Sequence, residues 1–215
     1  MSTLEDSVEF INQQPRCPCA LILDTSGSMT GRPIEALNAG LQTLRDDLQN
    51  DNLAKKRVEI AIVEFNSAVR VVQDFVAAAN FQPPTLTASG YTDLVGGINQ
   101  ALDLIQRRKS KYTSNGVPFY RPWAFLITDG KVTEYEQVAR RVREDEQNKR
   151  IAFFAVGVQG ANEECLKNIS VREPKMLAGL NFRELFLWLS ASMKRVSQSK
   201  PGEMVPLEKG TWEAV

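Results

Sequence analysis

Four short apolar runs constrain the fold more than any other feature of this sequence. They cover residues 19–23, 58–63, 123–127 and 151–156. Their hydrophobicity is nearly continuous rather than alternating, which is typical of strands buried on both faces of a parallel sheet. A fifth run, 69–72, follows the second after a connection too short for a helical crossover. It predicts an antiparallel partner strand at the edge of the sheet.

Amphipathic segments separate these runs and predict helices. Apolar residues recur every three or four positions over 34–48, where Pro33 is placed to open a helix, and again over 94–105. A capping box at 133–136 opens a third predicted helix, and a fourth covers 181–196. The alternation predicts an α/β fold with a doubly wound, mostly parallel sheet, one antiparallel edge strand and helices on both faces. We assign residues 1–16 to an N-terminal segment, 17–197 to the domain and 198–215 to a polar C-terminal tail.

Composition excludes several classes of chemistry. The 215 residues include no histidine, which removes Ser-His-Asp catalysis and histidine-ligated zinc. Lys+Arg and Asp+Glu balance at 26 each, so no overall attraction to nucleic acid is expected, and the basic cluster 107–111 is interpreted as the solvated end of a helix. The sequence shows neither a secretory signal nor a membrane span, so we expect a cytoplasmic protein whose three cysteines are reduced and buried.

Two of the predicted strands run directly into acidic loops. The first continues into Asp24, followed by Ser26 and Ser28 in the pattern D-x-S-x-S, and the third continues into Asp129. Functional groups of open parallel sheets collect outside the carboxyl ends of the strands, so we expect Asp24 and Asp129 to lie close together. Their mutual repulsion favours a divalent cation, and carboxylate and hydroxyl oxygens suit Mg²⁺.

With these residues in place, the chain resembles the von Willebrand factor type A family over about residues 17–196. The metal-ion-dependent adhesion site of that family combines D-x-S-x-S with a distant Thr and a distant Asp. The resemblance implies a Rossmann-like fold and a site for Mg²⁺, with Mn²⁺ or Ca²⁺ as alternatives. The implied metal ligands in this sequence are Asp24, Ser26, Ser28, Thr92 and Asp129.

Residues 24–36 and the segment 81–84 are similar, more specifically, to single-domain tellurium-resistance proteins of the TerY type. This resemblance implies a bacterial, cytoplasmic role in a stress response, with phosphatase-like or kinase-like proteins as associates. Family resemblance also implies binding of another protein through its Asp or Glu carboxylate. We expect the rim of that contact to include Thr25, Arg32, Tyr91 and Lys131.

Alternative functions remain open at this stage. A Mg²⁺-dependent phosphohydrolase of the haloacid-dehalogenase type would use Asp24 as its nucleophile. Ser26 disfavours it, because that chemistry places a second Asp at this position as general acid. The cation could also be purely structural. In the simplest alternative the loop oxygens only cap helices, with Thr92 as the N-cap of the helix that follows. The sequence favours a non-enzymatic, metal-dependent interaction module.

Overall fold

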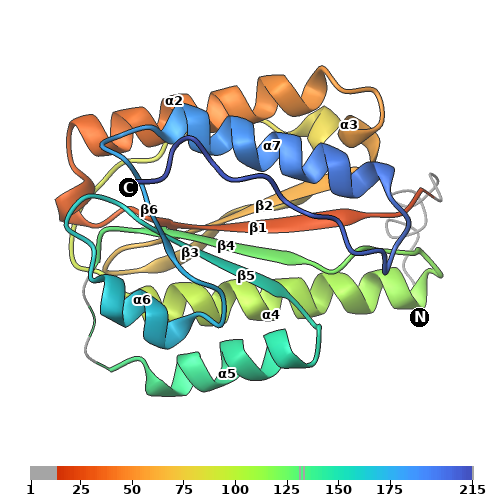
Figure 1. The fold of residues 1–215 in the computed structure, drawn as a ribbon. Coiled ribbons are helices and arrows are strands. Elements are labelled where there is room, and N and C mark those ends of the chain that lie inside the picture. The colour runs from red at the N-terminus through yellow and green to blue at the C-terminus, as the bar shows by residue number, and fades with distance from the viewer. Residues whose placement is uncertain (1–13, 131, 133, 215) are drawn as a thin grey trace.

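A six-stranded sheet forms the centre of the molecule (Figure 1). The computed structural model describes residues 14–214 except 131 and 133. The strands lie in the order β3-β2-β1-β4-β5-β6, and only the β2–β3 pair is antiparallel. Their bounds are β1 Cys17–Asp24, β2 Val58–Phe65, β3 Val69–Ala77, β4 Trp123–Thr128, β5 Ala152–Gly157 and β6 Lys175–Met176.

Helices cover both faces of this sheet, as Figure 1 shows. One layer holds α2 (Arg32–Gln49), α3 (Ala54–Arg57) and α7 (Phe182–Gln198). The other holds α4 (Leu94–Ser114), α5 (Glu136–Gln147) and α6 (Glu163–Ile169). Two 3₁₀ turns, Gly27–Met29 and Ala78–Asn80, complete the described elements. The arrangement confirms the predicted doubly wound fold and the antiparallel edge strand.

The apolar pattern placed most elements correctly, but some details differ. The sequence analysis did not identify α3, α6 or the two-residue β6. The N-cap of α4 is Asp93, whose carboxylate accepts a bond from the Gly96 amide at 2.9 Å, so the alternative role of Thr92 as the cap is wrong. Helix α5 begins at Glu136, and Thr133 of the proposed capping box lies outside the described residues.

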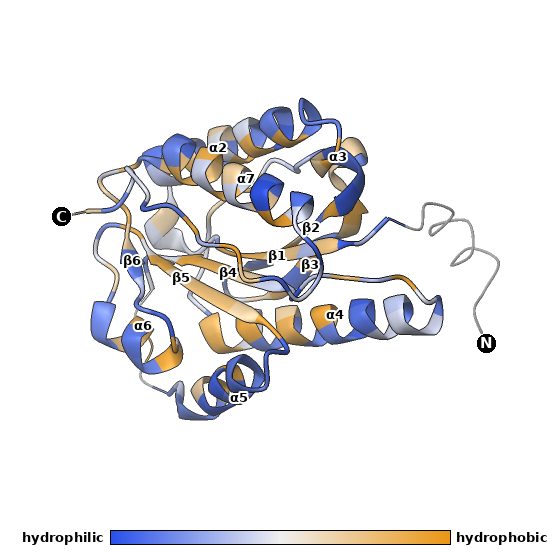
Figure 2. Cartoon of the chain, turned by 45° about the vertical axis from the view of Figure 1, so that its right-hand side comes forward, coloured by the Kyte–Doolittle hydropathy of each residue, from blue (hydrophilic) through white to orange (hydrophobic). Residues whose placement is uncertain are grey.

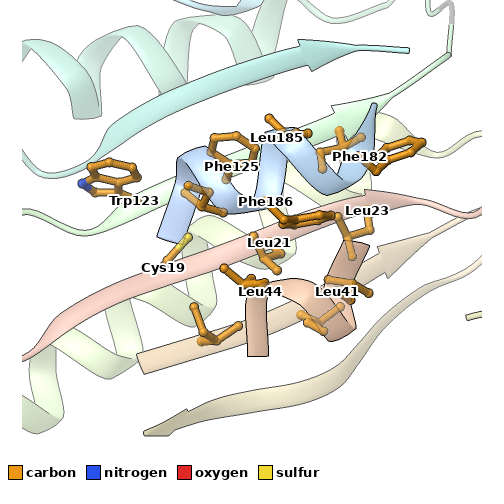
Figure 3. Close-up of a cluster of buried hydrophobic side chains, with 14 of the residues drawn as sticks. Cys19, Leu21, Leu23, Leu41, Leu44, Trp123, Phe125, Phe182, Leu185 and Phe186 are labelled. Atoms are coloured by element: carbon orange, nitrogen blue, oxygen red, sulfur yellow. The ribbon is translucent and has the colours of Figure 1, made fainter. Parts of the chain in front are cut away.

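Each face of the sheet contributes its own apolar core. Alternate β1 residues point to opposite faces: Leu21 and Leu23 pack with α2 and α7, while Ala20 and Ile22 pack with α4. Figure 3 shows Phe182, Leu185 and Phe186 of α7 facing β1 and β4. Figure 2 shows the same distribution as hydrophobic strands between helices whose outer faces are hydrophilic. This double burial explains the continuous apolar runs.

A buried ionic cluster joins α4 to the start of β2. The Arg108 guanidinium pairs with the Glu59 carboxylate at 2.8 Å, and both side chains are almost fully buried. The Tyr112 hydroxyl also donates to this carboxylate. Arg108 was expected in a solvated basic cluster, and that interpretation is wrong. Its partner Glu59 is distant in sequence, so no local pattern could reveal the pairing.

The C-terminal residues do not form a separate tail. Residues 200–214, here called the C-terminal strap, run back along α7 to β6 (Figure 1). The Ala178 amide donates to the Trp212 carbonyl at 2.8 Å, and the Ala214 amide donates to the Met176 carbonyl at 2.7 Å. Trp212 is 1% exposed within the core. The predicted domain boundary at residue 197 therefore does not mark the end of the packed structure.

The three cysteines are buried free thiols, as predicted. Burial, reinforced by the charge of Glu59, raises the pKa of the Cys17 thiol to about 12, so it stays protonated at neutral pH. Thiolate chemistry is thereby excluded at this position. Among the described residues, no helix is both long and apolar enough to cross a membrane.

Replacing Trp212 with Ala tests whether the C-terminal strap contributes to folding stability. Removal of a buried indole predicts a loss of about 3 kcal/mol of unfolding free energy, and a melting temperature lower by roughly 6–12 °C. Denaturant and thermal unfolding followed by circular dichroism measure both quantities. Met204→Ala is the matched control, because Met204 lies in the same strap and is 94% exposed. Equal stabilities of the two variants would show that the strap is not part of the folded unit.

Candidate metal centre

The site lies where two neighbouring parallel strands end. Strands β1 and β4 pair in register up to Leu23 and Ile127, so the residues that follow emerge at the same edge of the sheet. Asp24 ends β1 and is fully buried, whereas Asp129 follows β4 and is partly exposed. The two carboxyl groups therefore lie near each other, as predicted, although 104 residues separate them in sequence.

Hydrogen bonds fix both oxygens of the Asp24 carboxyl group. Oδ1 accepts from the Ser26 amide at 2.9 Å, and Oδ2 accepts from the Thr128 hydroxyl at 2.5 Å. The same hydroxyl accepts from the Gly130 amide at 2.8 Å. Thr128 thus ties β1 to the loop after β4 and orients Asp24. The sequence analysis did not single out Thr128, although its position as the last residue of a strand ending in an acidic loop could have drawn attention to it.

A short chain of oxygen atoms connects the two acidic loops. The hydroxyls of Ser26 and Ser28 lie 3.0 Å apart, and the Ser28 hydroxyl donates to Asp129 Oδ1 at 2.8 Å. Adjacent ligands of an octahedral ion with bonds near 2.1 Å stand about 3.0 Å apart. The two measured spacings are ordinary hydrogen-bond lengths, and they are also compatible with neighbouring ligands of Mg²⁺. Ca²⁺, which takes six to eight ligands at about 2.4 Å, accommodates similar spacings.

Thr92 reaches the same place from a third loop. A Cβ built on Gly130 would lie 2.8 Å from Thr92 Cγ2 and 3.3 Å from Asp24 Oδ2, so all three residues crowd around one point. Two backbone hydrogen bonds hold the loop before Thr92 against the loop that follows β1. The Gly27 amide donates to the Gly90 carbonyl and the Ser89 amide donates to the Thr25 carbonyl, both at 2.9 Å. The structure therefore brings all five predicted ligand residues to one end of the sheet: hydrogen bonds link Asp24, Ser26, Ser28 and Asp129, and the methyl group of Thr92 lies beside Gly130.

Gly90 explains how the third loop turns at this point. Its φ of +73° is in the left-handed region, and a Cβ there would lie 2.4 Å from Ser67 Oγ. Ser67 uses that oxygen to accept a bond from the Tyr91 amide at 2.8 Å. The contact orients the chain immediately before Thr92. Ser67 is a further positioning residue, and its place in the β2–β3 turn gave no sequence signal.

The electrostatics of the site favour a bound cation. Burial raises the pKa of Asp24; the bonds from Ser26 and Thr128 oppose that rise, and the charge of Asp129 adds to it. A divalent ion would offset both the burial and the repulsion. Among the described residues, no group of three or more Asp, Glu, Cys or His side chains gathers around a metal position. The donor set is accordingly two carboxylates supplemented by hydroxyls, which are hard oxygen ligands that fit Mg²⁺.

The predicted rim agrees with the structure only in part. Thr25 is fully buried and hydrogen-bonds to the Asn66 side chain at 3.1 Å, so its assignment to the rim is wrong. Its hydroxyl donates to the Phe65 carbonyl at 3.3 Å and so faces the end of β2 rather than solvent. Arg32 is exposed at the start of α2, and Tyr91 is 87% exposed beside Thr92. Lys131 lies outside the described residues.

Comparison with protein families identifies the fold. The family model described as von Willebrand factor type A domain matches residues 20–184. The chain belongs to this family. The matched region contains the five clustered oxygen-bearing residues, whereas none of the curated proteins matches the sequence significantly.

Solved structures show the same von Willebrand factor A fold at low sequence identity. The pilus adhesin SpaC of Lactobacillus rhamnosus GG, in its open conformation, is 13% identical with a TM-score of 0.67, covering 86% of this chain and 31% of its own. A von Willebrand factor type A protein from Catenulispora acidiphila is 18% identical with a TM-score of 0.64, covering 84% and 43%.

Proximal thread matrix protein 1 from the mussel byssus, described with a zinc-occupied adhesion-site motif, is 17% identical with a TM-score of 0.60. The alignment covers 87% of this chain and 47% of the mussel protein. The present chain thus spans less than half the length of each of these three proteins. At these identities the likeness establishes the fold alone.

Thr128→Val tests the positioning of Asp24. The change removes the donor to Asp24 Oδ2 and the acceptor for the Gly130 amide while keeping a β-branched shape. We expect metal affinity to fall by about 10-fold to 100-fold, as for other residues that orient a ligand. Titration calorimetry with Mn²⁺ measures it. An affinity equal to that of the wild type would mean that Asp24 does not need this support.

Gly130→Ala tests the crowding between the loops. The added methyl group would lie 2.8 Å from Thr92 Cγ2, so Thr92 must shift and metal affinity is expected to fall at least about 10-fold. Gly116→Ala is the matched control: its φ is +65°, but nothing lies within 4 Å of the added Cβ. The control should lose about 1 kcal/mol of stability and no metal affinity. Parallel loss of affinity in both variants would contradict the steric explanation.

Proposed function

We propose that this chain is a metal-dependent protein–protein interaction module. Asp24, Ser26, Ser28, Thr92 and Asp129 would hold Mg²⁺, and a coordination position left open would accept an Asp or Glu carboxylate of a partner protein. The observation that carries the proposal is the series of oxygen atoms from Ser26 through Ser28 to Asp129, spaced at 3.0 and 2.8 Å. Exposed Tyr91 and Arg32 are the rim residues in this proposal.

The donor set explains why an outside carboxylate would bind. Only two of the five side chains carry negative charge, so a divalent ion held by them remains an effective Lewis acid. Mn²⁺ and Ca²⁺ share the preference for oxygen ligands, so either could replace Mg²⁺ at this site. The zinc-occupied motif of the mussel relative supports occupation by a divalent ion.

The proposed chemistry is binding rather than turnover. The Ser26 hydroxyl interacts with that of Ser28, which donates to Asp129, and neither hydroxyl is acidic enough to protonate a leaving group at neutral pH. The sequence also contains no histidine that could replace the missing acid. A phosphohydrolase using Asp24 as nucleophile is therefore the less favoured function.

The finer assignment rests on the resemblance to TerY-type proteins. We propose a cytoplasmic role in a bacterial stress or tellurite-resistance response, with phosphatase-like or kinase-like proteins as partners. Support comes from the single-domain organisation of the described residues and the loop sequences 24–36 and 81–84. Neither nucleic acid nor a membrane is proposed as a partner, because the chain carries a formal net charge of zero.

Water proton relaxation with Mn²⁺ tests the proposed function. Mn²⁺ bound with an open position should enhance relaxation through exchangeable waters, and acetate, as the simplest carboxylate, should reduce the enhancement saturably. Ser28→Ala should weaken Mn²⁺ binding about 10-fold, whereas Ser110→Ala, which removes an exposed hydroxyl on α4, should not.

Two outcomes would contradict the proposal. Mn²⁺ binding with no effect of acetate would leave a purely structural ion. Mg²⁺-dependent hydrolysis of p-nitrophenyl phosphate that disappears in Asp24→Asn would instead support the phosphohydrolase.

A further inference from the structure

A cavity of about 290 Å³ lies away from the metal centre, between β5, α7 and the C-terminal strap. Its lining includes Phe125 and Phe154 from the sheet, Trp188 from α7, and Leu207 and Trp212 from the strap. None of the five candidate metal ligands lines it. A cavity of about 150 Å³ suffices for benzene, so this one has room for an aromatic ring with a substituent.

Aromatic rings form its walls. Trp188 stands edge-on to Phe154 and to Trp212, with ring centroids 6.5 and 5.5 Å away, and is tilted against Phe125 at 6.4 Å. Phe154 and Trp188 are only partly buried, although both lie on the inner face of the layer. Rings in these orientations favour another flat ring through offset or edge contacts. The walls therefore select an aromatic group over a branched aliphatic one.

A hydrogen-bond donor at this cavity has no acceptor in the described part of the chain. The indole N–H of Trp212 is buried and unpartnered there, and its residue is 1% exposed. By contrast, the indole N–H of Trp188 donates to the Glu208 carbonyl at 2.8 Å. Buried donors are normally satisfied, so the Trp212 N–H, which lies against Gly210, is a donor that a bound molecule could use.

The charges that line the cavity balance, with Arg172, Lys175 and Lys209 against Glu173, Glu208 and Glu213. Each lining carboxylate already has a cation: Lys175 for Glu213, Arg195 for Glu208 and Lys167 for Glu173. The lining cation Arg172 shares the single carboxylate of Glu146 with Arg121, at 3.1 and 3.0 Å. Lys209, also in the lining, pairs with no carboxylate within the described ranges. Arg172 and Lys209 are therefore the two lining cations that no lining carboxylate neutralises, and an anionic group at the cavity mouth could pair with either of them.

We infer that this cavity is a binding site for a small aromatic carboxylate. The ring would lie among Phe154, Trp188 and Trp212, and the carboxylate would interact with Arg172 or Lys209 at the mouth and provide an acceptor for the Trp212 N–H. The C-terminal strap forms one wall, so the ligand fastens the strap to α7 and β5. This site is independent of the proposed metal-dependent function.

Benzoate, titrated into the full-length protein, is the probe for this site. The indole N–H resonances of the three tryptophans are followed by ¹⁵N–¹H correlation spectroscopy. The signals of Trp188 and Trp212 should shift saturably, with that of Trp212 moving downfield as it gains an acceptor. Benzylamine, which reverses the charge, and acetate, which lacks the ring, should bind at least about 10-fold more weakly. Non-saturable shifts, or equal affinities for the three probes, would overturn the inference.

Matched variants locate the bound probe. Arg172→Gln should weaken benzoate binding about 10-fold if the guanidinium holds the carboxylate, whereas Lys200→Gln, which removes a charge of the strap that does not line the cavity, should change it less than about 2-fold. Trp212→Phe keeps an aromatic wall but removes the donor, and should weaken binding about 5-fold. Unfolding curves recorded in parallel separate loss of binding from loss of folding. Unchanged affinity in both Arg172→Gln and Trp212→Phe would contradict the proposed site.

Discussion

The parallel pairing of β1 with β4 is the interaction on which the candidate site depends. Hydrogen bonding in register up to Leu23 and Ile127 forces the next residues of both strands to the same edge, where Asp24 and Asp129 meet. Neither carboxylate could be held there without the surrounding core, because the two charges repel and Asp24 is fully buried. Two apolar layers, one on each face of the sheet, fix the strands and offset the free-energy cost of this repulsion and burial. The stability of the fold and the geometry of the candidate metal centre are thus linked through a single strand pair.

Much of this arrangement could be predicted from the sequence because it depends on patterns that are local and repeated. Continuous apolar runs reveal strands buried on both faces, and apolar residues at helical spacing reveal α2 and α4. Strand β6 has only two residues, which is too short for any periodicity. The C-terminal strap is held by main-chain bonds, by the buried Trp212 indole and by side-chain contacts from α7 and β6, and its polar composition gave no sign of this packing. These elements depend on partners far along the chain, and local patterns carry no information about them.

The candidate site also has residues that the sequence predicts and residues that it does not. The five oxygen-bearing residues could be identified because three loops carry a recognisable spacing, and the structure brings them together. The residues that position them could not be identified in this way. Thr128 acts through its side chain on another strand, and Ser67 supports the Gly90 turn from the β2–β3 hairpin. Thr25 was misassigned because its hydroxyl bonds to Asn66 and to the Phe65 carbonyl, and both partners lie about 40 residues further along the chain, where no local pattern shows them.

The hydrogen bonds of Asp24 also affect how strongly the proposed ion would bind a carboxylate from outside the chain. Both of its oxygens already accept a bond, one from the Ser26 amide and one from the Thr128 hydroxyl. Each bond draws electron density away from the carboxylate, so Asp24 would neutralise less of the charge of a neighbouring cation than a free carboxylate would. Asp129 is more exposed, and the Ser28 hydroxyl donates to it in turn. Since the remaining donors are neutral hydroxyls, an ion at this position keeps much of its positive charge. A third carboxylate, supplied by a partner, is the group that such an ion attracts most strongly.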